Sequence, residues 1–209
     1  IERMIKEDLL QPVDKSLIPN LDNINEGILG QSFDLSNNYW VPYFCGNVGI
    51  LYDKTVVDEK DLEAGWSILR NTKYKNQIYM YDSERDSFMV ALKALGYSMN
   101  TTKEREINEA YQWLLEQREE MNPVYVGDES IDTMISGVKA MAIMYSGDAA
   151  AVMSENPNMG YYMPKEGTNV WFDGFVISKE CKQTKLANEF INYMISDKVS
   201  YKNTVEVGY

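Results

Sequence analysis

The chain of 209 residues contains no histidine. Without histidine, the Ser-His-Asp and Cys-His nucleophile systems are excluded, and so is a zinc site with histidine ligands. Only two cysteines are present, Cys45 and Cys181, and they lie too far apart in the chain to form a metal-binding motif. A disulfide and two buried thiols both remain open for this pair. We therefore expect no metal and no other cofactor.

Long apolar runs are also missing, since no segment approaches the roughly 18 apolar residues of a membrane-spanning helix. No signal-peptide pattern is visible, because the opening IERMIKEDLL already has the spacing of an amphipathic helix over residues 1–10. The first residue is not Met and no helix cap precedes this segment. We interpret the chain as a piece of a longer protein.

Positive charge is scarce, with 20 Lys and Arg residues against 32 Asp and Glu residues and a formal net charge of −12. A nucleic-acid partner is not expected, because binding to phosphates requires a basic face. The acidity suits a bound cation, although many acidic proteins are merely soluble. The net charge alone leaves both explanations open.

Segments with strand-like and helical periodicity alternate along the chain. Beyond Pro42, which forbids a helix, Val48, Ile50 and Tyr52 alternate as in a strand. Ser83 is a suitable N-cap for a later helix. This alternation predicts an α/β protein, and the length suits one large domain or two small lobes.

Two further elements are expected near the carboxyl terminus. The spacing of the apolar residues predicts a helix that directs Leu186, Phe190, Ile191 and Met194 inward, followed by a short helical turn. Residues 170–177 read as a mostly buried strand that carries a carboxylate, Asp173, in its middle. A carboxylate in such a place is costly unless a cation or hydrogen-bond donors meet it. Asp173 either accepts backbone N–H bonds in a turn at Gly174 or faces a cavity.

Four segments place an acid or an aromatic residue where a strand ends, which is the usual ligand-binding edge of an open α/β sheet. These segments are YDSERD, MYSGD, VWFDG and EVGY. Ser83 and Asp86 in the first have a simpler explanation as helix-capping residues, and Tyr145 in the second as a core residue. If the four segments converge, aromatic walls and separate carboxylates surround one cavity. Such a cavity suits an alkyl ammonium, which offers N–H donors, cation–π attraction and apolar methylenes.

The order and spacing of several motifs resemble one family across essentially all 209 residues. The motifs are FDLSNNYWVPYFCGNVGILYD, YDSERDSFMVALKALGYSMNTT, INEAYQWL, MISGVKAMAIMYSGDA, MPKEGTNVWFDGFVI and ANEFINYMISDKVS with VEVGY. The chain resembles the substrate-binding proteins of bacterial spermidine/putrescine ABC importers. The resemblance implies a two-lobed fold of the type II periplasmic-binding-protein kind, truncated here at both ends. It implies a partial lobe 1 from residues 1–47 and 170–209 and a nearly complete lobe 2 from residues 48–169.

The same resemblance implies roles for individual residues. Trp171 matches an aromatic wall of the family, and Asp173 matches a carboxylate that pairs with an amine. Asp86 matches an acid that contacts another amine. The remaining matches are Tyr145, where relatives carry Trp or Tyr; Ser83, where relatives carry Asp or Ser; and Tyr209, a family tyrosine. The serine at position 83 leaves the preferred amine open, because one carboxylate fewer favours a diamine over a triamine.

The function that the resemblance implies is capture of a polyamine, spermidine or putrescine, by a binding protein that is not an enzyme. Hinge closure near Asn47 and Val170 would enclose the ligand, and the protein would present it to a membrane permease driven by ATPase subunits. The expected location is extracytoplasmic, through a lipid anchor or fusion to the permease. One alternative is a binding protein for another cationic or small organic solute. Another is a hydrolase that uses Asp86 and Asp173 as paired acids.

Overall fold

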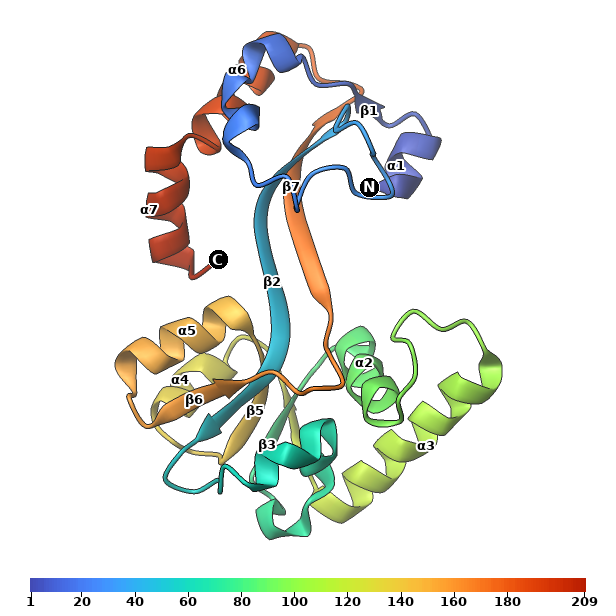
Figure 1. Cartoon of the computed structure of the whole chain (residues 1–209), viewed down its shortest axis with the longest axis vertical. Helices are drawn as coiled ribbons and strands as arrows, with labels where there is room; N and C mark the ends of the chain where they lie inside the picture. Colours follow the sequence, from blue (N-terminus) through green and yellow to red (C-terminus); the bar gives the residue numbers. More distant parts are fainter. The chain divides into compact units, whose positions relative to one another are not determined.

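The computed structural model describes all residues 1–209 and divides into two compact units (Figure 1). Unit 1 comprises residues 1–45, 171–207 and 209, and unit 2 comprises residues 46–170 and 208. The chain passes from one unit to the other within the long strand β2 (Trp40–Asp53) and at the first residues of β7 (Val170–Ser178). The assignment of these units to the lobes of a closing fold stays a prediction.

Unit 2 is built around a five-stranded mixed sheet. The strands follow the order β6-β2-β5-β3-β4, in which β3 pairs parallel with β4 and β5, and β2 pairs antiparallel with β5 and β6. Its elements after β2 are two 3₁₀ helices, η3 (Asp61–Arg70) and η4 (Thr72–Tyr74), then β3 (Ile78–Tyr81), α2 (Glu84–Ala94), α3 (Glu104–Met121), β4 (Val124–Val126), α4 (Ser130–Ile135), β5 (Met141–Tyr145), α5 (Ser146–Glu155) and β6 (Met159–Tyr162).

Alternate side chains of each strand in unit 2 point to opposite faces of the sheet. Both sets are apolar and pack into a core, so the sheet is buried on both faces. In β5, Met141 and Ile143 belong to one core, whereas Ala142 and Met144 belong to the other. The first core also contains residues of η3, α2 and α3, and the second contains residues of α4 and α5. Figure 1 shows these two pairs of helices on opposite sides of the sheet. The α/β prediction is confirmed here as a three-layer arrangement.

Parallel pairing brings the carboxyl ends of β4, β3 and β5 to one edge of the sheet. Helix α2 begins there with Ser83 as its N-cap, as the sequence predicts. Helix α5 begins at Ser146, directly after β5. The short loops at this edge place helix amino termini beside the strand ends.

Unit 1 contains the first part of β2 beside β7, and β1 (Leu10–Gln11) pairs antiparallel with β7. Its remaining elements are α1 (Glu2–Lys6), two 3₁₀ helices, η1 (Lys15–Leu17) and η2 (Pro19–Asn23), and the helices α6 (Thr184–Met194) and α7 (Asp197–Val207). A small core joins them, formed by Val13, Ile18, Leu21, Val41, Ile177, Ile191 and Ile195. Unit 1 therefore has its own apolar cluster.

The predicted helix over residues 1–10 is wrong in extent. Helix α1 ends at Lys6 and has no buried residue, whereas Leu10 lies buried in strand β1 opposite Ser178. Asp8, which has a positive φ of 53°, turns the chain between the two elements. Local apolar spacing indicated one helix, but pairing with β7 draws its end into the sheet.

The inward face predicted for the helix at residues 184–194 is also wrong in part. Ile191 is buried, but Phe190 is 52% exposed and Leu186 is exposed as well. The short turn expected after it is an 11-residue helix, α7. The amphipathic spacing predicted the position of the helix correctly. Within unit 1, however, only part of its apolar face is buried.

Candidate functional site

Asp86 lies in the first turn of α2 and is only 4% exposed. The hydroxyl of Ser83 accepts a hydrogen bond from the Asp86 backbone N–H at 3.3 Å, which begins the helix. A carboxylate in this turn is stabilised by the free N–H groups of the helix amino terminus. The simpler explanation of Ser83 as a helix cap is therefore confirmed. Asp86 needs a separate explanation, because its side chain points to other partners.

Two neutral side chains donate to the Asp86 carboxylate. The Tyr145 hydroxyl donates to Oδ2 at 2.9 Å, and the Asn169 amide nitrogen donates to Oδ1 at 3.1 Å. A carboxylate has about four acceptor positions, so each oxygen keeps one that these bonds do not use. Neither donor carries a charge. The buried negative charge of Asp86 is thus oriented by the protein but is not neutralised by these partners.

Tyr81 and Asp128 form a second tyrosine–aspartate pair beside the first. The Tyr81 hydroxyl donates to Asp128 Oδ1 at 2.6 Å, and the rings of Tyr81 and Tyr145 meet edge to face with centroids 5.0 Å apart. Burial, aided by the hydrogen bond to Asp128, raises the pKa of Tyr81 well above its ordinary value. Burial and Asp86 do the same to the pKa of Tyr145. Both phenols therefore remain neutral hydrogen-bond donors at physiological pH.

Sequence reasoning missed Tyr81, Asp128 and Asn169. Tyr81 ends β3, and Asp128 comes shortly after the parallel neighbour β4. The strand-end pattern that selected Asp86 and Tyr145 therefore applied to these two residues as well. Asn169 carries no comparable signal, because it lies among other polar residues in the loop before β7 and does not follow the end of a strand.

Unit 1 contains an aromatic group around Tyr209. The rings of Trp171 and Tyr209 meet at 69° with centroids 4.9 Å apart, and Phe44 lies 6.4 Å from Tyr209. Asp173 is two residues beyond Trp171 in β7 and therefore lies on the same face of that strand. An exposed carboxylate thus lies two residues along β7 from Trp171, whose ring contacts Tyr209.

The structure corrects the premise of a mostly buried strand at 170–177. Val170 is 63% exposed, Asp173 is exposed, and Ile177 alone in β7 is buried. The turn at Gly174 is also wrong, because this residue lies inside the strand. A Cβ atom at Gly174 would lie 1.9 Å from Trp40 Nε1, so glycine here admits the indole ring of the neighbouring strand. Within unit 1, the Asp173 carboxylate is therefore exposed to solvent and is not held by the backbone N–H groups of a turn.

The predicted site residues thus fall into two groups. Ser83, Asp86 and Tyr145 come together in unit 2, whereas Trp171, Asp173 and Tyr209 belong to unit 1. That both groups serve one ligand stays a prediction.

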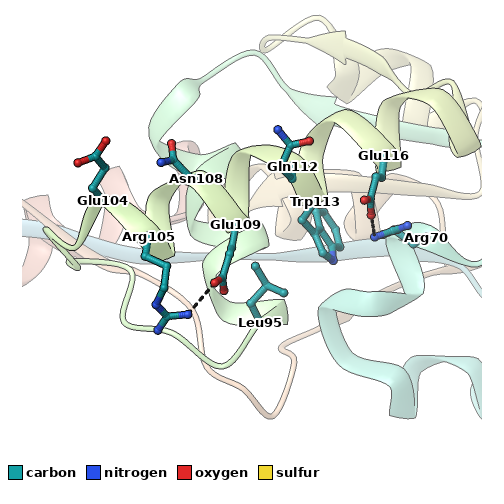
Figure 2. A pocket seen from close by; sticks show the side chains of 9 residues that line it. All are labelled: Arg70, Leu95, Glu104, Arg105, Asn108, Glu109, Gln112, Trp113 and Glu116. Carbon is teal, nitrogen blue, oxygen red and sulfur yellow. Dashed lines mark hydrogen bonds and ion pairs between the residues drawn. The ribbon is translucent and has the colours of Figure 1, made fainter.

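A hollow on the surface of unit 2 lies along α3 and includes none of the predicted site residues (Figure 2). Its lining consists of Arg70, Leu95, Glu104, Arg105, Asn108, Glu109, Gln112, Trp113 and Glu116. Arg70 pairs with Glu116 at 2.8 Å and Arg105 with Glu109 at 2.6 Å. Both guanidinium groups are already matched by carboxylates. The charged lining of this hollow is therefore largely ion-paired.

Both cysteines are free thiols, Cys45 exposed and Cys181 half-buried, so the disulfide is not formed. No cluster of three or more histidine, cysteine or acidic residues is arranged to hold a metal ion. None of the helices has both the length and the apolar content that crossing a membrane requires.

Comparison with known proteins decides the family. Residues 1–202 match the family described as bacterial extracellular solute-binding proteins. The chain belongs to this family. The resemblance inferred from the motifs is thereby confirmed, and the solute-binding family is not a class of enzymes.

The similarity to individual relatives covers the whole length of this solute-binding protein. It is 29% identical to the spermidine/putrescine-binding periplasmic protein of Salmonella typhimurium, over 100% of this chain and 60% of that protein. The solved spermidine/putrescine ABC transporter substrate-binding protein of Streptococcus pneumoniae is 36% identical, with a TM-score of 0.87 over 100% of this chain and 64% of that chain. A lipoprotein of Treponema pallidum is similar at 25% identity and a TM-score of 0.86. The chain thus spans about 60% of the length of the curated relatives it matches, and the predicted periplasmic-binding-protein-like fold is confirmed.

Proposed function

We propose that this chain belongs to the extracytoplasmic solute-binding component of an ABC importer and takes part in the capture of a polyamine such as spermidine or putrescine. One observation carries the proposal: the buried Asp86 carboxylate is held by two neutral donors beside the aromatic rings of Tyr81 and Tyr145. Relatives named for spermidine and putrescine binding support the same ligand class.

An alkyl ammonium group complements this arrangement chemically. It offers three N–H donors, and Asp86 has unused acceptor positions on both oxygens. In a site with little water, attraction between the ammonium and the carboxylate is stronger than in bulk solvent. The faces of aromatic rings add cation–π attraction and cover the methylene groups. Asp86 therefore binds one ammonium group of the ligand, and Tyr145 both orients Asp86 and contacts the alkyl chain.

The other predicted residues complete the proposal. Asp173 meets a further ammonium group, and Trp171 and Tyr209 provide the aromatic walls next to it. Ser83 acts mainly through the first turn of α2, because its hydroxyl accepts the Asp86 backbone N–H. The protein acts by binding and release, without catalysis, and delivers the ligand to a membrane permease and its ATPase subunits.

Calorimetric titration of the protein with spermidine, putrescine and a neutral disaccharide tests this function. We expect heat of binding from at least one polyamine, weakened by added salt because charge attraction contributes, and none from the sugar. Equal binding of the sugar would favour a different solute. Slow release of heat with breakdown of a glycoside, in place of a saturable binding curve, would favour the hydrolase.

A further inference from the structure

We infer that Asn169 is a positioning residue for the amine-binding carboxylate, through which it controls the affinity for the ligand. The inference rests on the proposed function, because it assigns a role within the same site. Asn169 does not need to touch the ligand to have this role. Its side chain joins Asp86 to the backbone of β2.

The hydrogen bonds of Asn169 determine which way its amide group faces. Its Oδ1 accepts from the Val48 backbone N–H at 3.0 Å, and its Nδ2 donates to Asp86 Oδ1 at 3.1 Å. A backbone N–H only donates, so the amide oxygen must face Val48 and the NH₂ group must face Asp86. The reverse orientation would leave Val48 unpaired and would place two acceptors together. Asn169 therefore presents a donor to the carboxylate in a single orientation.

Asn169 is only 9% exposed, and the loop that carries it is fastened at two other points. The Trp66 indole N–H donates to the Gly167 carbonyl at 2.9 Å, and the Thr168 hydroxyl donates to the Val48 carbonyl at 2.5 Å. Strand β6 pairs with Ile50–Asp53 and does not reach Val48. The side chains of Thr168 and Asn169 thus satisfy both backbone polar groups of a buried residue in β2.

The consequence is a carboxylate held at both oxygens, by Asn169 on one and Tyr145 on the other. Two bonds in different directions prevent rotation of the carboxylate plane, so the remaining acceptor positions point in fixed directions before the ligand arrives. Binding then loses less conformational freedom than it would with a mobile acid. Loss of Asn169 should weaken binding only while Asp86 carries the charge that meets the amine.

A double-mutant cycle of Asn169→Leu and Asp86→Asn tests this role, because leucine is similar in size and makes neither hydrogen bond. Spermidine affinity is measured by calorimetry for all four proteins. We expect Asn169→Leu to weaken binding about three- to tenfold with Asp86 present and less than twofold in the Asp86→Asn background. If Asn169→Leu does not fold, Asn169→Ser replaces it, since its side chain is too short to bridge both partners.

Asn156→Leu is the matched control. The Asn156 side chain also makes one bond as donor, to the Ile135 carbonyl, and one as acceptor, from the Asn158 N–H, but it does not contact the site. We expect it to lower the melting temperature without changing spermidine affinity. An equal loss of affinity from Asn169→Leu in both backgrounds, or an equal loss from Asn156→Leu, would overturn the positioning role while leaving the proposed function intact. Absence of spermidine binding by the unmodified protein would overturn both.

Discussion

Asp86 differs from an ordinary helix-capping acid in the partners of its two oxygens. The side-chain contacts are to Tyr145 at the end of β5 and Asn169 in the loop before β7. Residues from three separate parts of the chain therefore meet at one carboxylate that is almost fully buried. Burial of an acid with only neutral donors costs free energy that the amino terminus of α2 offsets in part. A bound ammonium group would supply the missing positive charge.

The variant Trp171→Leu tests whether Trp171 forms an aromatic wall of the proposed site. Leucine keeps apolar bulk but removes the π face, so spermidine binding should weaken by roughly 0.5–2 kcal/mol. Calorimetry at constant ionic strength measures the change. Trp113→Leu is the control, because the ring of Trp113 in α3 packs against the Arg70 guanidinium and Trp113 is not a predicted site residue. Unchanged affinity in Trp171→Leu would leave Trp171 with a packing role alone.

At the scale of elements, the close approach of β7 and β2 in unit 1 depends on Gly174. A Cβ atom there would lie 1.9 Å from Trp40 Nε1 and 2.6 Å from the Val41 carbonyl oxygen. We expect Gly174→Ala to lower the free energy of unfolding by about 1–3 kcal/mol, the usual cost of overpacking. Urea denaturation followed by circular dichroism measures this.

Gly127→Ala is the matched control for that experiment. Its nearest contact would be the end of the flexible Glu129 side chain, 2.9 Å away, which can move. A small change in this variant is expected. Gly174→Ala with unfolding free energy equal to that of the unmodified protein would show that the two strands separate easily.

Local patterns predicted the elements well where one strand or helix makes its own core contacts. The alternation of Val48, Ile50 and Tyr52 in β2 and the Ser83 cap of helix α2 are examples, because local pattern and burial agree there. Prediction was wrong at Leu10 and Phe190, whose surroundings depend on segments distant in the chain. The strand-end rule found Asp86 and Tyr145. It had no means to find Asn169, whose role arises only when the loop before β7 lies against Val48.

The net charge of −12 on this chain favours the approach of a cation such as the polyamine proposed as the ligand. This long-range attraction is screened by salt, whereas the proposed contact between the buried Asp86 carboxylate and an ammonium group would be screened less. The two contributions can be separated by removing one carboxylate at the site and another of equal charge far from it. Glu119 on the exposed side of α3 provides the distant position.

Spermidine titration of Asp86→Asn and Asp173→Asn, with Glu119→Gln as the control, shows whether these two carboxylates bind the ammonium groups. Each site variant should bind spermidine at least tenfold more weakly than the unmodified protein, a loss of about 1.4 kcal/mol, because one ammonium group loses its carboxylate. Glu119→Gln should bind within twofold of the unmodified protein, and all three variants should melt as folded proteins. Unchanged spermidine affinity in both site variants, with normal melting temperatures, would show that neither Asp86 nor Asp173 binds an ammonium group of the ligand.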